Sequence, residues 1–246
     1  MSCGPLLGGV LVEQFNSDSA FLSLAGLSVL AFILCLFFLP DYKIPAKSSK
    51  PILSLLFHPS LKVPVIGFLL YSAVFSVFVV FLPLLGHSIQ LDYSDISLLI
   101  FGASITMVIC QRFSGKFIDI FNKYWTIAIG AGMMSAALLL FPFTGNLLHL
   151  LGYSILLGCG LGLTLTSFSA MMVIEGRKHG QGSVEGILNT AQGIGIIISP
   201  VLFGLVLDHS NITLVFILGS LVSVVMTGWM VILYEKSLHN KEPYDG

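Results

Sequence analysis

Long stretches without any charged side chain are the feature that most constrains what this chain of 246 residues can fold into. A helix needs roughly 20 mostly apolar residues to cross about 30 Å of hydrocarbon. The longest stretch is divided in two by a Pro-Phe-Thr-Gly-Asn turn at 142–146. The stretches therefore predict seven full membrane spans. They lie within Ser19–Leu39, Val63–Leu91, Ile96–Gln111, Tyr124–Ile174, Gly186–Leu207 and His209–Tyr234.

The composition is also typical of a membrane protein. Hydrophobic residues make up 56% of the chain and charged residues 9%, whereas a soluble domain carries about 25% charged residues. The mean hydropathy is +0.97, so the average residue prefers lipid to water. A backbone in lipid must satisfy its own hydrogen bonds, and no alternating strands of about ten residues are visible. We therefore expect an all-α membrane protein built as a helical bundle.

The basic residues indicate how the predicted spans are oriented. All 11 Lys and Arg residues fall on one side of the spans, and the opposite loops at 13–18, 86–93, 144–146 and 208–211 contain none. Loops rich in Lys and Arg remain in the cytoplasm. We therefore expect a multi-pass protein of the cell membrane whose basic loops and C-terminal tail are cytoplasmic. The basic residues are Lys43, Lys47, Lys50, Lys62, Arg112, Lys116, Lys123, Arg177, Lys178, Lys236 and Lys241.

The N-terminus holds an apolar segment, Met1–Val12, that is shorter than a span. At 1.5 Å per residue it would reach about 18 Å as a helix, and it lacks the basic residues of a signal peptide. We expect it to be the outer half of a span, left by a truncated reading frame or a split gene. Its sequence Gly4–Glu13 also parallels Ser199–Asp208. Two related halves explain this parallel, as does the general frequency of Gly and Pro in membrane helices.

Three motifs resemble those of the major facilitator superfamily of transporters. Gly4–Gly9 reads G-P-L-L-G-G and matches the G-P-x-x-G-G that ends the fifth helix of the family's antiporters. Gly115–Tyr124 is similar to the family's cytoplasmic loop G-x-x-x-D-[RK]-x-G-[RK]-[RK], and Gly180–Asp208 has the Gly-rich texture of its eleventh helix. The loop motif keeps Gly115 and Asp119 but departs from the pattern at Ile120, Asn122 and Tyr124. The chain thus resembles the end of the family's fifth helix through its twelfth.

The resemblance implies both a division of the chain and a function. Residues 1–39 would be a remnant of the N-terminal half, 40–62 the cytoplasmic loop between halves, 63–234 the C-terminal six-helix bundle and 235–246 a cytoplasmic tail. It implies secondary transport of a small-molecule substrate across the lipid bilayer, in the direction of efflux, by alternating access between two halves. One half is expected to be inactive alone, and a separately encoded N-terminal half is then its partner.

Two groups of residues are candidates for gating or close packing. Prolines kink a helix and glycines let a neighbouring helix approach, so the first group fits either a hinge between the halves or simple packing. That group comprises Gly4, Pro5, Gly8, Gly9, Pro200 and Gly204. The second group, Gly115 and Asp119, belongs to the family loop, where the resemblance makes Asp119 a conformational latch. A solvated loop carboxylate is the alternative reading of Asp119.

Polar and aromatic residues within the spans are candidates for a substrate cavity, because burying polar groups in lipid is costly. On helical spacing we expect Asn189, Gln192 and Ser199 to share one face. Interhelical hydrogen bonding and aromatic packing explain the same residues equally well. The cavity candidates are Tyr71, Phe75, Phe78, Thr164, Ser167, Asn189 and Gln192.

Motifs of other functional classes are missing from the sequence. The four cysteines have no C-x-x-C spacing and no H-E-x-x-H motif occurs, so we expect no enzyme, metal site or cofactor. The run G-C-G-L-G at 158–162 lies in an apolar span and predicts helix packing rather than a nucleotide loop. No basic patch with interleaved aromatic residues predicts nucleic-acid binding. A seven-helix receptor-like protein and a non-functional transporter remnant stay as alternatives, although the receptor reading lacks its D-R-Y and N-P-x-x-Y motifs.

Overall fold

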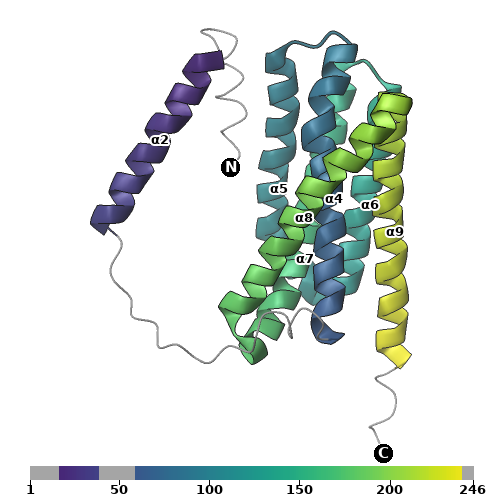
Figure 1. Cartoon of the computed structure of the whole chain (residues 1–246). Helices are drawn as coiled ribbons and strands as arrows, with labels where there is room; N and C mark the ends of the chain where they lie inside the picture. Colours follow the sequence, from purple (N-terminus) through teal and green to yellow (C-terminus); the bar gives the residue numbers. More distant parts are fainter. Residues whose placement is uncertain (1–16, 39–58, 240–246) are drawn as a thin grey trace, which may run out of the picture.

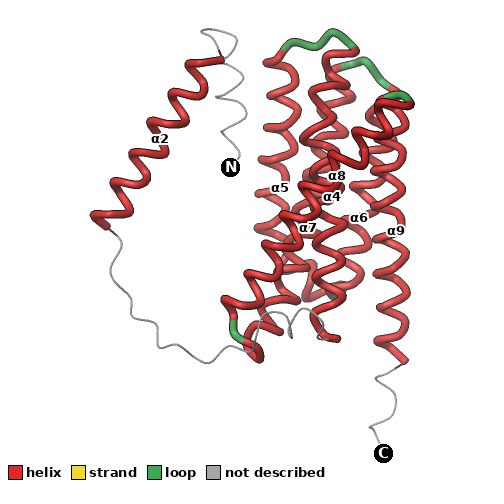
Figure 2. The backbone as a smooth tube through the Cα atoms, viewed as in Figure 1, coloured by secondary structure: helices red, strands yellow, loops and turns green. Residues whose placement is uncertain are grey.

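The computed structural model describes residues 17–38 and 59–239, and every regular element in these ranges is helical (Figure 2). Seven of the described helices are long and apolar enough to cross a membrane. They coincide with the seven spans predicted from the uncharged stretches, which confirms the all-α fold class. The helices are α2 Ser17–Phe38, α4 Pro59–Ser88, α5 Tyr93–Phe121, α6 Lys123–Leu140, α7 Leu147–His179, α8 Gln181–His209 and α9 Ile212–His239, with the 3-10 turn η1 Phe141–Phe143 between α6 and α7.

Helices α4 and α7 form the centre of a six-helix bundle (Figure 1). α7 packs against α5 and α6, α4 packs against α8 and α9, and the two central helices touch each other. The buried share of the apolar span is 56% for α4 and 61% for α7, but only 22% for α5 and α8. Phe78, Phe168 and Phe216 are among the buried side chains that fill the core. α5 and α8 are therefore edge helices, each with one broad face turned away from the bundle.

Helix α2 stands apart from the other six (Figure 1). No part of its span Phe21–Phe38 is buried inside the structure, and large apolar side chains point outward all round it. A helix that is apolar on every side is stable in lipid or against another membrane-spanning body. The bundle helices occupy 59–239, which is longer than the expected 63–234, because α4 and α9 continue as helices beyond their apolar parts.

Glycines bring the backbone of α7 into direct contact with two neighbouring helices. Gly158 and Gly162 face α5, where a Cβ atom added to Gly162 would lie 2.6 Å from the carbonyl oxygen of Met107. Gly160 faces α6, where an added Cβ would lie 2.5 Å from the carbonyl oxygen of Gly130. Real Cβ contacts are not this short, so only glycine fits these positions. The prediction that the G-C-G-L-G run is a helix-packing motif is confirmed.

Small residues and two reciprocal hydrogen bonds join α4 to α8. Ser76 Oγ donates to the carbonyl oxygen of Ile196 at 3.3 Å, and Ser199 Oγ donates to that of Ala73 at 3.0 Å. Close to both, a Cβ added to Gly195 would lie 2.7 Å from a carbonyl oxygen of α4. Interhelical hydrogen bonds of this kind stabilise packed membrane helices, where lipid offers hydroxyl groups no partner.

Two of the connections at one end of the bundle consist of a single residue each. Asn122 joins α5 to α6 with φ 69° and ψ 147°, and Gly180 joins α7 to α8 with φ 97° and ψ 119°. The loop predicted over Gly115–Tyr124 is therefore wrong, since Gly115 and Asp119 lie within the last two turns of α5. No proline interrupts this segment, so the helix continues until one residue with a positive φ turns the chain.

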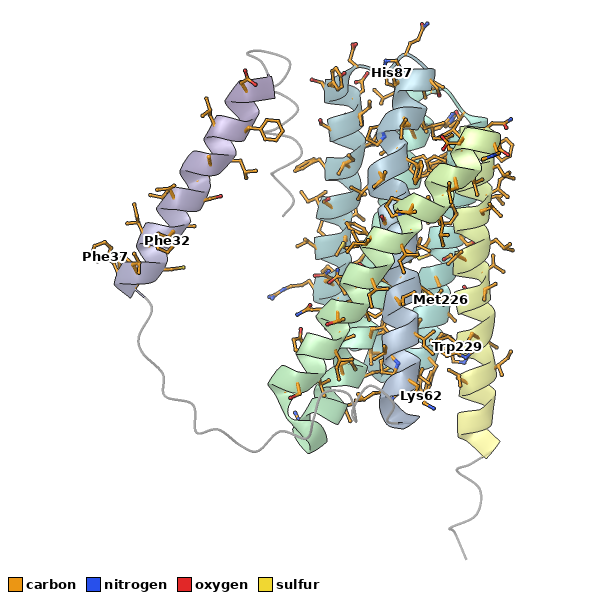
Figure 3. The ribbon with its side chains drawn as sticks, viewed as in Figure 1. Phe32, Phe37, Lys62, His87, Met226 and Trp229 are labelled. Carbon is orange, nitrogen blue, oxygen red and sulfur yellow. The ribbon has the colours of Figure 1, made fainter. Side chains whose placement is uncertain are left out.

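The Lys and Arg side chains that the structure describes in the bundle lie at the end that carries the Asn122 and Gly180 connections. Lys62 lies near the start of α4 and His87 near its end, and Figure 3 shows the two at opposite ends of the helix. The basic residues near the Lys62 end are Arg112 and Lys116 late in α5, Lys123 at the start of α6 and Arg177 late in α7. The opposite end carries Asp92, Asp95 and Asp208. That the Lys62 end faces the cytoplasm remains a prediction.

Candidate functional site

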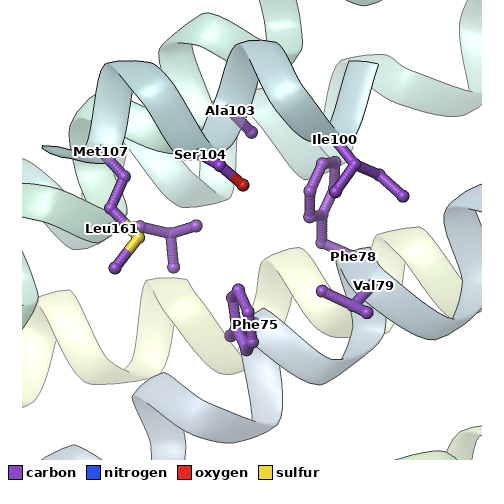
Figure 4. A pocket seen from close by; sticks show the side chains of 8 residues that line it. All are labelled: Phe75, Phe78, Val79, Ile100, Ala103, Ser104, Met107 and Leu161. Carbon is purple, nitrogen blue, oxygen red and sulfur yellow. The ribbon is translucent and has the colours of Figure 1, made fainter. Parts of the chain in front are cut away.

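A cavity of about 260 Å³ lies between α4, α5 and α7, near the middle of all three helices (Figure 4). This volume is slightly below the range of roughly 300–1,000 Å³ that is usual for ligand pockets. All but one of its lining side chains are apolar. The lining residues are Phe75, Phe78, Val79, Ile100, Ala103, Ser104, Met107 and Leu161.

Two of the predicted cavity residues, Phe75 and Phe78, line this cavity from α4. They lie three residues apart and so share a face of the helix. Phe78 is buried, and its ring packs against that of Phe141 with the centroids 5.8 Å apart, which holds it in place. Tyr71 is only 2% exposed and does not line the cavity. Its ring stacks on that of Phe68, also on α4, at a centroid distance of 5.5 Å.

The α5 wall of the cavity was not predicted from the sequence. Its residues follow the i, i+3, i+4, i+7 spacing of a single helix face. This signal is present in the sequence, but the opposite face of α5 is equally apolar, so the pattern does not stand out. The wall is formed by Ile100, Ala103, Ser104 and Met107, and the opposite face by Ile105, Val108 and Ile109.

Ser104 supplies the one hydroxyl group among the lining side chains. Figure 4 shows its oxygen directed into the space between α4 and α5. Within the described part of the chain, this hydroxyl forms no hydrogen bond. Thr106, two residues further along α5, differs because its hydroxyl donates to the carbonyl oxygen of Gly102 at 2.7 Å. The Ser104 hydroxyl is therefore available to a ligand, whereas the Thr106 hydroxyl is already satisfied.

Thr164 and Ser167 are fully buried in α7 and do not line the cavity. The Thr164 hydroxyl donates to the sulfur of Met134 on α6 at 3.7 Å. The Ser167 hydroxyl donates to the carbonyl oxygen of Leu163, one turn earlier, at 2.8 Å. Both groups are satisfied within the bundle, which is the packing role that the sequence left open for them.

Asn189 and Gln192 lie on α8, away from the cavity. Asn189 is exposed and Gln192 half-buried, whereas Ser199 is buried and bonded to α4. Gln192 and Ser199 lie seven residues apart and so within about 20° of each other round the helix, whereas Asn189, ten residues before Ser199, is offset from it by about 80°. The three residues therefore follow a face that turns from the exposed Asn189 to Ser199 at the α4 contact.

Pro200 and Gly204, the candidates on α8 for a hinge or for close packing, mark no close crossing within the described bundle. Pro200 lies within α8, and a Cβ added to Gly204 would meet no atom of the described chain within 4 Å. The close crossing lies instead at Gly195, against α4. Gly115 likewise has open space around its Cβ position. Gly4, Pro5, Gly8 and Gly9 lie outside the described residues, as does the side chain of Asp119.

The cavity lining contains no charged residue. The charged side chains described on α4, α5 and α7 all lie towards the ends of these helices. Within 17–38 and 59–239, no group of three or more His, Cys, Asp or Glu side chains is placed to hold a metal ion. The arrangement therefore offers apolar contacts and one hydrogen bond to a small molecule near the middle of the bundle.

A model of the family described as Major Facilitator Superfamily matches residues 64–246, which include nearly all of α4 and the five helices that follow it. The chain belongs to the Major Facilitator Superfamily. This membership confirms the resemblance seen in the three motifs, and it agrees with a multi-pass membrane protein.

A relative within the Major Facilitator Superfamily is similar over most of the chain. It is the "Uncharacterized MFS-type transporter YuxJ" of Bacillus subtilis (strain 168), which is 26% identical over 228 residues. The match covers 87% of this chain but 57% of the relative, so the chain spans little more than half the relative's length.

Proposed function

We propose that this Major Facilitator Superfamily member takes part in secondary transport of a small molecule, which it exports across the cell membrane by alternating access. The observation that carries the proposal is the cavity between α4, α5 and α7 at mid-depth in the bundle. Secondary transporters bind their substrate near the midplane, between two helical bodies. The likeness of Gly4–Gly9 to the antiporter motif supports export as the direction. The chain acts as a transporter and not as an enzyme.

Alternating access needs a second helical body, and the edge helices offer surfaces for it. α5 and α8 expose broad apolar faces, and α8 also exposes the amide of Asn189. Lipid would leave that amide without a hydrogen-bond partner, whereas a packed helix can supply one. We infer that an N-terminal half of the transporter covers these faces and completes the substrate site.

The distribution of charge orients the proposed export across the membrane. The Lys62 end of the bundle faces the cytoplasm by the positive-inside rule. Export therefore moves the substrate from the Lys62 end towards the His87 end. The cavity lining holds no carboxylate, so if transport is coupled to protons, either the second body supplies the titrating group or coupling uses another route.

Dye accumulation in bacterial cells without efflux pumps of their own tests this proposal. One strain expresses the chain alone, and another adds the part of the Bacillus subtilis relative that the chain does not cover. The dyes are N-phenyl-1-naphthylamine, which is uncharged, ethidium, a cation, and fluorescein, an anion. We expect energy-dependent loss of at least one dye in the second strain, and Ser104→Phe, which fills the cavity, should abolish it. Unchanged accumulation of all three dyes, with both proteins present in the membrane, would refute transport.

A further inference from the structure

We propose that the cavity between α4, α5 and α7 binds an uncharged, lipophilic aromatic molecule through apolar contacts and a single hydrogen bond to Ser104. This assigns a substrate class to the site and rests on the proposed function. The assignment depends on three features of the cavity, namely its walls, the placement of charge around it and the free hydroxyl.

The walls of the cavity favour an aromatic ligand. Phe75 and Phe78 present rings from α4, and Met107 presents its thioether from α5 (Figure 4). Aromatic rings pair favourably with one another, and sulfur makes favourable contacts with a ring. Because Phe78 is held by Phe141 behind it, part of this surface is already ordered before a ligand arrives.

The placement of charge disfavours an ionic ligand. Moving an ion into this cavity removes its hydration, and no lining group offers an opposite charge. The nearest charges on α5 are Asp95, five residues before Ile100, and Arg112, five residues after Met107. The spacing places Asp95 about 140° round the helix from Ile100. The same spacing places Arg112 about 140° round the helix from Met107, and its side chain is exposed. Neither side chain lines the cavity, so neither compensates a charge inside it.

The Ser104 hydroxyl gives the site its one point of polar recognition. It is half-buried, directed into the cavity and free of hydrogen bonds to the described chain. A ligand that carries one N–H or O–H group, or one acceptor, satisfies it, whereas a ligand with several polar groups leaves the others unpaired. The preferred ligand is therefore a largely hydrocarbon molecule with one polar atom.

The cavity is open to such a ligand along one side. Val79, on its rim, is 36% exposed, and its neighbour Val80 is 39% exposed. α4 and α5 meet closely near the His87 end, where a Cβ added to Gly86 would lie 2.7 Å from the Ile96 side chain. The cavity lies between these helices further along them, and a lipophilic molecule can enter it where Val79 is exposed.

Two probes that share one skeleton separate the uncharged class from the ionic class. N-phenyl-1-naphthylamine and 8-anilino-1-naphthalenesulfonate are both anilinonaphthalenes that fluoresce in apolar surroundings, but only the second carries a charge. Each is titrated against the full chain in lipid nanodiscs, with empty nanodiscs as background. The variants are Ser104→Ala, Ser104→Phe and Thr106→Val, the last as a matched control whose hydroxyl is already bonded along α5.

We expect a saturable component for the uncharged probe only. Ser104→Ala should weaken it roughly two- to tenfold, the loss of one hydrogen bond, Ser104→Phe should abolish it, and Thr106→Val should leave it unchanged. Saturable binding of the sulfonate that Ser104→Phe removes would overturn the assignment, as would naphthylamine binding that neither Ser104 variant alters. If the Ser104→Phe variant does not insert into the membrane, the test is decided by comparing naphthylamine binding by Ser104→Ala with that by Thr106→Val.

Failure of this assignment and failure of transport give different results. Naphthylamine binding without loss of any dye from cells would leave the site assigned and remove the proposed function. Export of ethidium or fluorescein by a chain that does not bind naphthylamine would keep transport and overturn the uncharged class.

Discussion

Gly130 on α6 and Gly160 on α7 lie backbone to backbone. A Cβ atom added to Gly130 would lie 2.8 Å from the carbonyl oxygen of Gly160, and one added to Gly160 would lie 2.5 Å from that of Gly130. Side chains such as Met134 also lie close to these positions, but the two carbonyl oxygens belong to the backbone and cannot move aside without shifting a helix. The crossing of α6 and α7 therefore depends on both glycines. It fixes the position of α7, which contributes Leu161 to the cavity lining.

Gly160→Ala should destabilise the bundle, because its methyl group enters the space of a backbone oxygen. Overpacking of this kind costs about 1–3 kcal/mol, and the measurement is the unfolding temperature of the purified chain in detergent. Gly152→Ala on the same helix is the matched control, since its Cβ position is open, and it should be neutral or stabilising by up to about 1 kcal/mol. Equal unfolding temperatures for the two variants would contradict the α6–α7 contact.

A second pair of glycines distinguishes the two proposed crossings on α8. Gly195→Leu should lower the unfolding temperature strongly, because the added side chain must push α8 away from α4. Gly204→Leu should leave the isolated bundle's stability unchanged, since its Cβ position is open. A larger loss for Gly204→Leu than for Gly195→Leu would place the crossing at Gly204 after all.

The joint between α5 and α6 should depend on the backbone conformation of Asn122. With φ 69° and ψ 147°, it lies in a region that glycine adopts readily and that β-branched residues avoid. Asn122→Val should destabilise the chain by about 1–3 kcal/mol, whereas Asn122→Gly should be neutral or stabilising. Thermal unfolding of both variants provides the measurement, and a valine variant as stable as the glycine variant would contradict the joint. The family motif has Gly at this position, so the departure at Asn122 preserves the turn.

The course of the chain through the membrane could be predicted from the sequence, and the contacts between helices could not. Each span is long, uncharged and self-contained in its backbone hydrogen bonds, so hydropathy alone locates it. Crossings depend instead on which side of a helix meets which neighbour. Within the described bundle, α8 crosses α4 closely at Gly195 and not at Gly204, although both are glycines in the same helix, because local sequence does not show where α4 passes.

The candidate site was predicted in part for the same reason. Phe75 and Phe78 stood out because aromatic residues repeat along one face of α4, and both line the cavity. Ser104 was missed because a single serine in an apolar helix usually bonds its own backbone, as Thr106 does. Its free hydroxyl is visible only once α4 and α7 are placed around it.

Labelling of single cysteines should determine the orientation of the bundle. In a background without the native cysteines, Lys116→Cys lies at the basic end, and Ser88→Cys and Asn211→Cys lie at the opposite end. All three positions are exposed. In intact cells a membrane-impermeant maleimide should label Ser88→Cys and Asn211→Cys but not Lys116→Cys, which should react only after permeabilisation. The reverse pattern would overturn the proposed orientation.

Oxidative cross-linking should test the packing of α5 against α7 beside the cavity. The thiols of Cys110 on α5 and Cys159 on α7 lie within hydrogen-bonding reach of each other. Gly162, one turn beyond Cys159, brings the backbones close, since a Cβ added there would lie 3.0 Å from the Cys110 Cβ. A disulfide needs this kind of approach between helices. Copper phenanthroline in membranes should therefore oxidise the two thiols to one intramolecular disulfide.

The cross-link is measured by counting the thiols that remain reactive. The denatured chain has four cysteines, and a polyethylene-glycol maleimide should add to all four before oxidation and to two afterwards. Cys159→Ser, with three cysteines throughout, serves as the control because its Cys110 has lost its partner. Four reactive thiols after oxidation would mean that α5 and α7 do not pack as described, and the wall that carries Ser104 and Met107 would then have to be placed elsewhere.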